Sequence, residues 1–384
     1  MKPRLILAGA GHAHLGVLRD LARRAWPAAD IQLVCPHAYT LYSGMAPGWL
    51  AGRYRWDEIH IDTASLAARA GVTWTRGHIV AVDAGARRIR LDDGRELEYD
   101  LLSLNLGSDI RRPDGVGGVS IRPLPAFRAY WESWTFEADR IQPGTTQRIA
   151  VVGGGAAGIE VLLALRAGLL QAAPRVYWQW HLVSQSPDIL PGWPQGARRR
   201  ALGVLKDRGV HVHLGRRAVH ITDHTLIDAQ GLALPMDRVV WCSGAAAPQC
   251  LRHSGLALDG AGFIQVDAHL RSTSHPEVYA AGDCAAHPTP LPKAGVYAVR
   301  QGPVLTQNLR AALGQNRAAS YKPQPRALAL LNTADGQAIG QWGPFSVQGP
   351  WVMALKDRID RRFIRRHAAV AAASLQSTRG DHHA

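Results

Sequence analysis

Cysteine is scarce in this sequence, and long apolar runs are missing from it. The four cysteines among 384 residues include no pair with CxxC spacing, so we expect neither a disulfide framework nor a local redox dithiol. No apolar run approaches the ~20 residues that a membrane-spanning helix needs. The stretch Leu5–Ala8 leads directly into a glycine turn, unlike the long apolar region of a signal peptide. These absences predict a cytoplasmic protein.

Acidic residues are few relative to basic ones, with 30 Asp and Glu against 44 Lys and Arg and a formal charge of +14. Such an excess is compatible with a nucleic-acid partner. However, the sequence has no zinc-finger spacing and no aromatic-rich RNA-binding motif. The charge suits an enzyme that binds polyphosphate cofactors or rests on an anionic membrane surface. We therefore expect no nucleic-acid partner, and we expect no metal site.

Helix-like and strand-like segments alternate along a chain that is 47% hydrophobic. This alternation is typical of an α/β fold, and the length indicates two or three domains.

The segment RLILAGAGHAH combines a buried strand, a glycine turn and the start of a helix. Glycine at 9 allows the tight turn, and glycine at 11 lets the backbone approach a pyrophosphate at the helix N-terminus, where free N–H groups favour anions. A histidine replaces the third glycine of the usual GxGxxG, so an ordinary strand–turn–helix is an open alternative. The predicted ligands here are Gly9, Ala10, Gly11, His12 and His14.

The segment RIAVVGGGAAGIE contains a complete GxGxxG, formed by Gly153, Gly155 and Gly158 after the expected strand Ile149–Val152. Two such units in one chain predict two dinucleotide sites.

Both units lack the acidic residue that usually binds a ribose 2′-hydroxyl at the end of the second strand. Cys35 and Ser184 occupy those positions. The serine removes a carboxylate that would repel a 2′-phosphate, so NADPH stays possible beside NADH. The basic run Arg198–Arg200 could meet that phosphate, or it could form a solvated helix face.

The stretch HPEVYAAGDCA predicts a strand over Val278–Ala281 that ends in Gly282 and Asp283. The glycine allows close approach of the chain to a ligand, and the carboxylate can accept hydrogen bonds from ribityl hydroxyls. That polyol beside a pyrophosphate is a property of a flavin. Upstream, MDRVVWCSGAAAP is similar to the strand and turn by which a chain returns from a nicotinamide domain to a flavin domain.

The motifs GAGHAH, GGGAAGIE, WCSG and VYAAGDCA follow the order seen in pyridine nucleotide–disulfide oxidoreductase-like flavoproteins. The sequence most resembles the branch of the type II NADH dehydrogenases. Within it, GHAHLGVLR, LYSGMAPGWLAGRY, PKAGVYAVRQGPVLTQNLRAAL and KDRIDRRF are similar to the subgroup often fused to selenide, water dikinase (selenophosphate synthetase). The resemblance ends near Arg366 and implies two Rossmann-like domains, as in glutathione reductase. It also implies bound FAD, with NADH or NADPH as co-substrate.

The resemblance also implies individual site residues. Lys293, with the helix start near Gly295, is expected to stabilise negative charge on the flavin ring, although a surface lysine is the alternative. The further implied flavin ligands are Cys35, Ser43, Gly44, Met45, Pro47, Gly107, Gly282, Asp283, Lys293, Ala294 and Val296. The implied nucleotide ligands are Gly153, Gly155, Gly158, Glu160, Ser184 and Gly244.

Cysteine chemistry of the family is not expected. Disulfide reductases need a CxxxxC-like pair early in the chain, where only Cys35 lies, and sulfide:quinone relatives need cysteines without recognisable counterparts here.

We expect an FAD-binding domain over 1–110 and 245–315, an NAD(P)H-binding domain over 111–244, and a C-terminal cap over 316–384. The expected reaction carries electrons from NAD(P)H through the flavin to an acceptor, either a quinone or a sulfur or selenium compound, with a functional link to selenophosphate synthetase as one option. The alternative is a flavin-binding sensor or partner protein with little turnover.

The segment WVMALKDRIDRRFIRRH predicts a basic amphipathic helix, with Val352, Leu355, Ile359 and Phe363 on one face. Such a helix could rest on an anionic membrane surface, or its apolar stripe could pack on the flavin domain. Its charged residues are Lys356, Arg358, Arg361, Arg362, Arg365 and Arg366, against Asp357 and Asp360.

Overall fold

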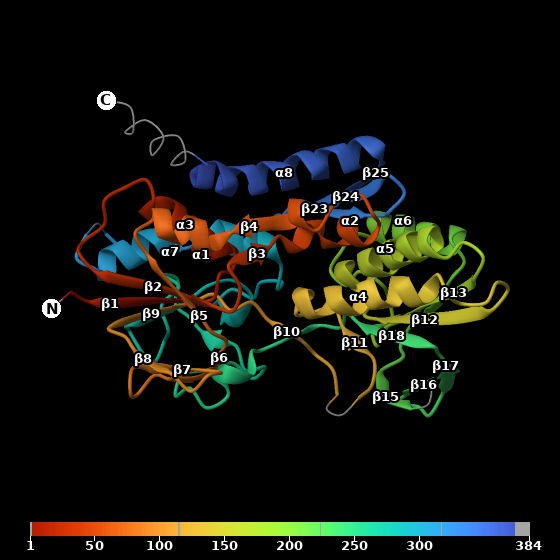
Figure 1. Cartoon of the computed structure of the whole chain (residues 1–384), viewed down its shortest axis with the longest axis horizontal. Helices are drawn as coiled ribbons and strands as arrows, with labels where there is room; N and C mark the ends of the chain where they lie inside the picture. Colours follow the sequence, from red (N-terminus) through yellow and green to blue (C-terminus); the bar gives the residue numbers. More distant parts are fainter. Residues whose placement is uncertain (1, 114–115, 223, 316, 373–384) are drawn as a thin grey trace.

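The computed structural model describes residues 2–113, 116–222, 224–315 and 317–372, with the side chains of 369–372 excepted. It shows two α/β lobes side by side, with one long helix lying across both (Figure 1). The predicted α/β fold with two Rossmann-like units is confirmed.

The first lobe is built on a parallel sheet in the order β21-β9-β1-β2-β5. Its central strand β1 pairs with β2 on one side and β9 on the other, so the first glycine turn leaves from the middle of the sheet. The strands are β1 (Arg4–Ala8), β2 (Asp30–Cys35), β5 (Thr73–Arg76), β9 (Leu101–Leu104) and β21 (Val278–Ala280). The last strand ends one residue before the predicted Ala281.

Helices and smaller sheets cover this lobe. The helices are α1 (His12–Leu21), α2 (Ala46–Leu50), α3 (Thr63–Arg69) and α7 (Gly295–Ala312). The additional antiparallel strands are β3 (Tyr39–Leu41) with β4 (His60–Asp62), and β6 (Ile79–Asp83) with β7 (Arg88–Leu91) and β8 (Glu96–Glu98). A short parallel pair joins β20 (Ile264–Gln265) to β22 (Ala285–Ala286).

The second lobe repeats the same plan in the order β11-β18-β12-β13-β14. Here β12 is central and carries the second glycine turn. The strands are β11 (Val119–Ser120), β12 (Thr146–Val152), β13 (Tyr177–Val183), β14 (Val210–His213) and β18 (Arg238–Trp241). The helices α4 (Leu124–Ala138), α5 (Ala156–Ala172) and α6 (Gln195–Asp207) accompany it, with a small sheet of β15 (Ala218–Thr222), β16 (Thr225–Asp228) and β17 (Ala233–Pro235).

Two strands connect the lobes. β10 (Asp109–Ile110) leaves the first sheet, and β19 (Ala245–Ala246) returns from the second, and they pair in antiparallel fashion. The predicted domain division at 110 and 245 falls on these strands, and we propose it as the boundary.

The C-terminal region forms a sheet of β23 (Ala329–Asn332), β24 (Ala338–Trp342) and β25 (Phe345–Gly349), followed by α8 (Pro350–Ala372). The sheet packs on the second lobe, because Leu331 and Ile339 belong to its core. Helix α8 runs from there across the first lobe (Figure 1).

The predicted apolar face of this helix is partly wrong. Val352 is buried and Phe363 is partly buried, whereas Leu355 and Ile359 are exposed. The inner face is rotated and includes Lys356 and Asp360, whose side chains lie 2.7 Å apart and neutralise each other. Because an ion pair occupies the inner face, the hydrophobic period alone misplaces it.

Candidate functional site

Asn105, at the end of β9, holds the first glycine turn. Its Oδ1 accepts hydrogen bonds from the backbone N–H groups of Ala13 and His14, at 3.0 and 3.3 Å, and its Nδ2 donates to the Ala281 carbonyl. A Cβ atom at position 11 would lie 2.3 Å from this Oδ1, so glycine is required there. Sequence reasoning missed Asn105, although a polar residue directly after the apolar strand LLSL was a usable signal.

His14 explains how the first turn does without its third glycine. The side chain is fully buried, with Nδ1 2.6 Å from the Gly9 carbonyl and Nε2 2.8 Å from Ser103 Oγ. Burial lowers the pKa of His14 to about 4, so the ring is neutral at pH 7. His14 therefore supports the turn from inside the domain.

His12 lies where three distant segments meet. Its ring centroid is 5.4 Å from that of Tyr42 and 5.5 Å from that of Phe363 on α8. A Cβ at Gly295, the first residue of α7, would lie 3.9 Å from His12 Nε2. The fold thus brings the predicted turn at 9–12 beside the predicted segment at 293–296. Burial lowers the pKa of His12 to about 4.

The Gly282–Asp283 turn lies next to the first glycine turn and to α7. Gly282 has a φ of +73°, and its N–H donates to Gln301 Oε1 on α7. Ser108 Oγ lies 3.3 Å from Asp283 Oδ2, and Arg122 Nη1 lies 3.4 Å from it. Arg122 also donates to the Ser108 hydroxyl at 2.7 Å. Arg122 comes from the second lobe, so an arginine that sequence reasoning missed joins the lobes at the predicted ribityl carboxylate.

A cavity of about 480 Å³ opens beside this turn. Lys293 lines it, donates a 2.7 Å hydrogen bond to the Ala285 carbonyl and lies over the Phe263 ring. Burial lowers the pKa of Lys293, and the nearby Cys284 and Asp283 partly offset this. Lys293 is half-buried in a cavity wall.

The remaining predicted flavin residues lie on several elements of the first lobe and on the loop that leaves it. Cys35 is buried at the end of β2, and burial raises the pKa of its thiol. Ser43, Gly44 and Met45 form one 3-10 turn, and the Gly44 carbonyl accepts a hydrogen bond from Lys356. The other members are Pro47, buried in α2; Gly107, in the left-handed region at φ +77°; and Ala294 and Val296, at the start of α7.

The second glycine turn is closely packed at Gly153 and Gly158 and open at Gly155. A Cβ at Gly158 would lie 1.9 Å from the Gly153 carbonyl oxygen, and one at Gly153 would lie 2.3 Å from the Cys242 carbonyl oxygen. Gly155, the N-cap residue of α5, and Gly244 have no neighbour within 4 Å of an added Cβ. No side chain caps α5 at its N-terminus. The open N–H groups form an anion-binding end.

Ser184 and Glu160, the other predicted nucleotide residues, differ in position. Ser184 directly follows β13, and an added Cβ on Gly154 would lie 2.5 Å from its Oγ. Glu160 points to the C-terminal sheet, where it accepts a hydrogen bond from the Asn332 N–H. Burial raises the pKa of Glu160 to about 7, with Lys356 acting in the opposite direction.

These residues fit FAD and a nicotinamide dinucleotide. The first turn, Asp283 and Arg122 would hold the FAD pyrophosphate and ribityl chain, and the second turn would hold the nucleotide pyrophosphate. The cavity and the open space beside Gly107, Gly155 and Gly244 leave room for ligand atoms.

In the part of the chain that the structure describes, the cysteines are buried or half-buried and unpaired. All four cysteines are free thiols, and burial raises the pKa of Cys250 to about 12 and of Cys284 to about 11. In the described ranges no group of histidine, cysteine, aspartate or glutamate residues could hold a metal ion.

The family description of pyridine nucleotide-disulphide oxidoreductases matches residues 3–302. The chain belongs to this family. It is an FAD-dependent oxidoreductase with NADH or NADPH as co-substrate, as the two glycine turns and the flavin motif predicted. Family membership favours this enzyme over the alternative of a flavin-binding sensor.

Individual relatives include an NADH dehydrogenase-like protein and a quinone reductase. An NADH dehydrogenase-like protein of Mycobacterium tuberculosis is 26% identical over 299 residues, covering 74% of this chain and 73% of that protein. Demethylphylloquinone reductase NdbB of Synechocystis sp. is 25% identical over 379 residues, covering 91% and 89%. The solved structure of sulfide:quinone oxidoreductase from Aquifex aeolicus matches with a TM-score of 0.79 at 15% identity, covering 96% and 92%. The predicted resemblance to type II NADH dehydrogenases is confirmed.

Proposed function

We propose that this flavoprotein passes electrons from NAD(P)H to a quinone, which it meets at a membrane surface on the outer face of the C-terminal region. One of the relatives above, demethylphylloquinone reductase NdbB, is named for a quinone. The observation that carries the proposal is an apolar patch on that face, next to the helix that borders the predicted flavin site.

We use the word patch for the exposed apolar residues of the β24–β25 hairpin and of α8, two elements that contact each other. Trp342 and Phe345 are partners in the hairpin and are 58% and 69% exposed, and Trp351 at the start of α8 is 59% exposed. Val347, Leu355 and Ile359 extend the patch and are also exposed. Exposed large aromatic side chains on neighbouring elements are typical of interaction sites.

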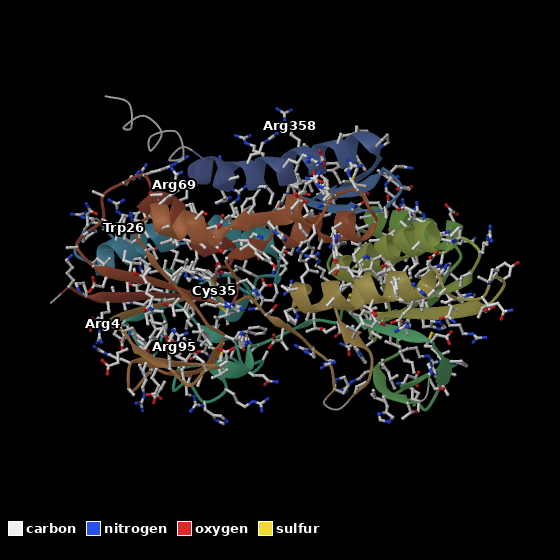
Figure 2. The ribbon with its side chains drawn as sticks, viewed as in Figure 1. Arg4, Trp26, Cys35, Arg69, Arg95 and Arg358 are labelled. Atoms are coloured by element: carbon white, nitrogen blue, oxygen red, sulfur yellow. The ribbon has the colours of Figure 1, made fainter. Side chains whose placement is uncertain are left out.

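Cations border the patch. Arg358 lies on the outer side of α8, away from the body of the molecule (Figure 2). Arg362, Arg365 and Arg366 are exposed on the same helix. The predicted cations Lys356 and Arg361 do not join them, because they pair with Asp360, Asp357 and Glu58. Aromatic anchors beside exposed arginines suit an anionic lipid surface. Among the described residues, no helix is long and apolar enough to span a membrane.

The inner side of α8 faces the predicted flavin site. Lys356 donates to the Gly44 carbonyl at 2.7 Å, and Phe363 stacks on Tyr42 with ring centroids 4.6 Å apart. A quinone that enters under α8 from the lipid would therefore approach the segment at 42–45.

FAD held by the first glycine turn and Asp283 would supply the redox chemistry between the nicotinamide and the acceptor. A quinone needs two protons as well as two electrons to become a quinol. Glu160, with its pKa near 7, can hold one such proton beside Lys356 at neutral pH. We also propose that Lys293 and the N-terminus of α7 stabilise negative charge at the flavin site.

Vesicle co-sedimentation tests the membrane contact. Wild-type protein should bind anionic vesicles at low salt, and the variant Phe345→Ser/Trp351→Ser should lose most of this binding. Phe136→Ser is the matched control, because Phe136 is 63% exposed on α4, away from the patch. Equal binding by all three proteins, or no binding by wild type, would contradict the proposal.

Acceptor assays separate the chemical alternatives. NAD(P)H oxidation should be faster with quinone in anionic vesicles than with polysulfide or selenite at equal concentration. The opposite order would favour a sulfur or selenium acceptor and a functional link to selenophosphate synthetase.

A further inference from the structure

We propose that the second glycine turn prefers a 2′-phosphorylated dinucleotide, NADPH, and that Arg216 and Arg198 contact the 2′-phosphate. This inference rests on the proposed function in placing the nucleotide at Gly153–Gly158. It goes further because it selects between the two nucleotides.

The end of β13 marks the place of the adenosine ribose. In a βαβ dinucleotide unit, the residue after the second strand is the one that reads the ribose 2′-position. Gly153 N–H donates to the Val183 carbonyl at 2.8 Å, so the glycine turn begins beside the last residue of β13. Ser184 follows and lies against Gly154.

This position is uncharged and enclosed. Ser184 is 4% exposed, and its Oγ accepts a hydrogen bond from the Ser186 N–H. An NAD-specific unit would place a carboxylate here, where it binds the 2′-hydroxyl and repels a 2′-phosphate. Ser184 has no carboxylate, so it neither binds the 2′-hydroxyl in this way nor repels a 2′-phosphate.

The loop after β14 brings Arg216 to the same strand end. The backbone N–H of Arg216 donates to the Ser184 carbonyl at 2.8 Å, and the backbone N–H of Gly215 donates to the Ser186 carbonyl at 2.9 Å. Arg216 Nη1 pairs with Asp228 at 3.1 Å, and this is one contact out of the five N–H donors of a guanidinium. Asp228 also accepts backbone hydrogen bonds from Gln230 and Leu232, so its position does not depend on Arg216 alone.

Arg198 lies on α6 and contacts the loop that follows β13. It pairs through Nη1 with Asp188, and its Nε is buried without a hydrogen-bond partner in the described structure. Asp188 is the carboxylate that could instead bind a 2′-hydroxyl, but its pairing with Arg198 offsets its charge. Leu190 N–H donates to the Gly154 carbonyl, which holds this segment against the glycine turn. Arg216 and Arg198 thus belong to contacts around the end of β13, which lacks the usual acid, and each is paired with one carboxylate.

Calorimetry with nicotinamide-free fragments tests the preference without relying on turnover. The FAD-loaded full-length protein is titrated with ADP-ribose and with 2′-phospho-ADP-ribose. We expect the phosphorylated fragment to bind at least about tenfold more tightly, as charge-assisted hydrogen bonds to a phosphate allow. Arg216→Ala and Arg198→Ala should each weaken the phosphorylated fragment about tenfold and change ADP-ribose binding by less than about twofold.

Arg175→Ala is the matched control, since Arg175 is exposed in the same lobe before β13 begins, at the opposite edge of the sheet. It should leave both affinities unchanged. Asp188→Asn gives an independent test that keeps both arginines, and it should strengthen binding of the phosphorylated fragment.

The outcomes separate the two proposals. Equal or tighter binding of ADP-ribose overturns the NADPH preference while leaving the nucleotide site in place. If both arginine variants keep the preference for the phosphorylated fragment, the assigned contacts are overturned. Failure of both fragments to bind overturns the nucleotide site itself, and the proposed function with it.

Discussion

At the scale of single residues, the first dinucleotide turn depends on polar side chains from elsewhere in the sequence. Asn105 binds the N-terminus of α1 from the end of β9, and His14 supports the turn where a glycine is usual. Asp283 faces the same turn and is joined by Ser108 and Arg122. A buried polar group needs its partners close by, so these positions are specified together.

The variant Asp283→Ala should bind FAD more weakly than the wild-type protein. The ribityl hydroxyls would lose a charged acceptor, which contributes about 1.5–3 kcal/mol, and Arg122 would lose a partner. We expect the ratio of flavin to protein after desalting to fall at least about tenfold in the weak-binding limit. Asp93→Ala, in the exposed turn before β8, is the control. Full flavin retention by Asp283→Ala would show that the site is misplaced.

Glu160 should give the protein a specific dependence of stability on pH. Burial raises its pKa from 4.5 to about 7, so the folded state holds a proton that the unfolded state has released between these values. The contribution of the Glu160 proton to the free energy of unfolding is therefore fully present below pH 4.5, and it is lost as the pH rises through about 7.

Glu160→Gln keeps an acceptor for Asn332 and cannot ionise. Its melting temperature should rise relative to wild type as pH increases from 4.5 to about 7 and then stay level. The slope in free energy should be at most about 1.4 kcal/mol per pH unit. A difference between the two proteins that is constant with pH would mean that Glu160 ionises normally.

At the scale of elements, α8 is the piece that connects the surface to the site. Its inner side carries the buried Lys356–Asp360 pair, and Tyr54 donates to Asp357 at 2.7 Å. Its outer side carries the apolar patch and the arginines. Polar contacts therefore attach the inner face of α8 to the rest of the molecule. The hydrophobic pattern alone does not predict that this face points inward.

Lys356→Met should destabilise the docking of α8 by about 3–5 kcal/mol, because it leaves the Asp360 carboxylate buried without its cation. The double variant Lys356→Met/Asp360→Leu should recover most of this loss, since it removes both charges. Denaturant midpoints measure the effect, with Arg358→Met on the outer face as control. If the double variant were no more stable than the single one, the pair would not be the cause.

At the scale of the whole molecule, the two lobes repeat one plan with a glycine turn on each central strand. The β10 and β19 strands and helix α8 connect them (Figure 1). Damage to one turn should therefore leave the other site in place.

Gly158→Ala should abolish reduction of the flavin by NADH and NADPH while FAD stays bound. An added Cβ would lie 1.9 Å from the Gly153 carbonyl oxygen and must displace the second turn. Anaerobic mixing with each nucleotide, followed by flavin absorbance, measures the loss. Gly203→Ala is the control, because a Cβ there meets no neighbour within 4 Å. Loss of FAD from Gly158→Ala would show that the two sites are not independent.

The sequence by itself determined the fold class, both glycine turns, the flavin motif and the existence of the C-terminal helix. Each of these depends on local spacing, such as glycines between a strand and a helix, which survives as a pattern along the chain. Only the tertiary structure decided the contacts of Asn105, Arg122 and Arg216, and which side of α8 faces inward. These depend on residues far apart in sequence that become neighbours when parallel strands end at one edge of a sheet. Burial likewise moved the pKa of Glu160 and hid Lys356, because the cost of enclosing a charge depends on what packs around it.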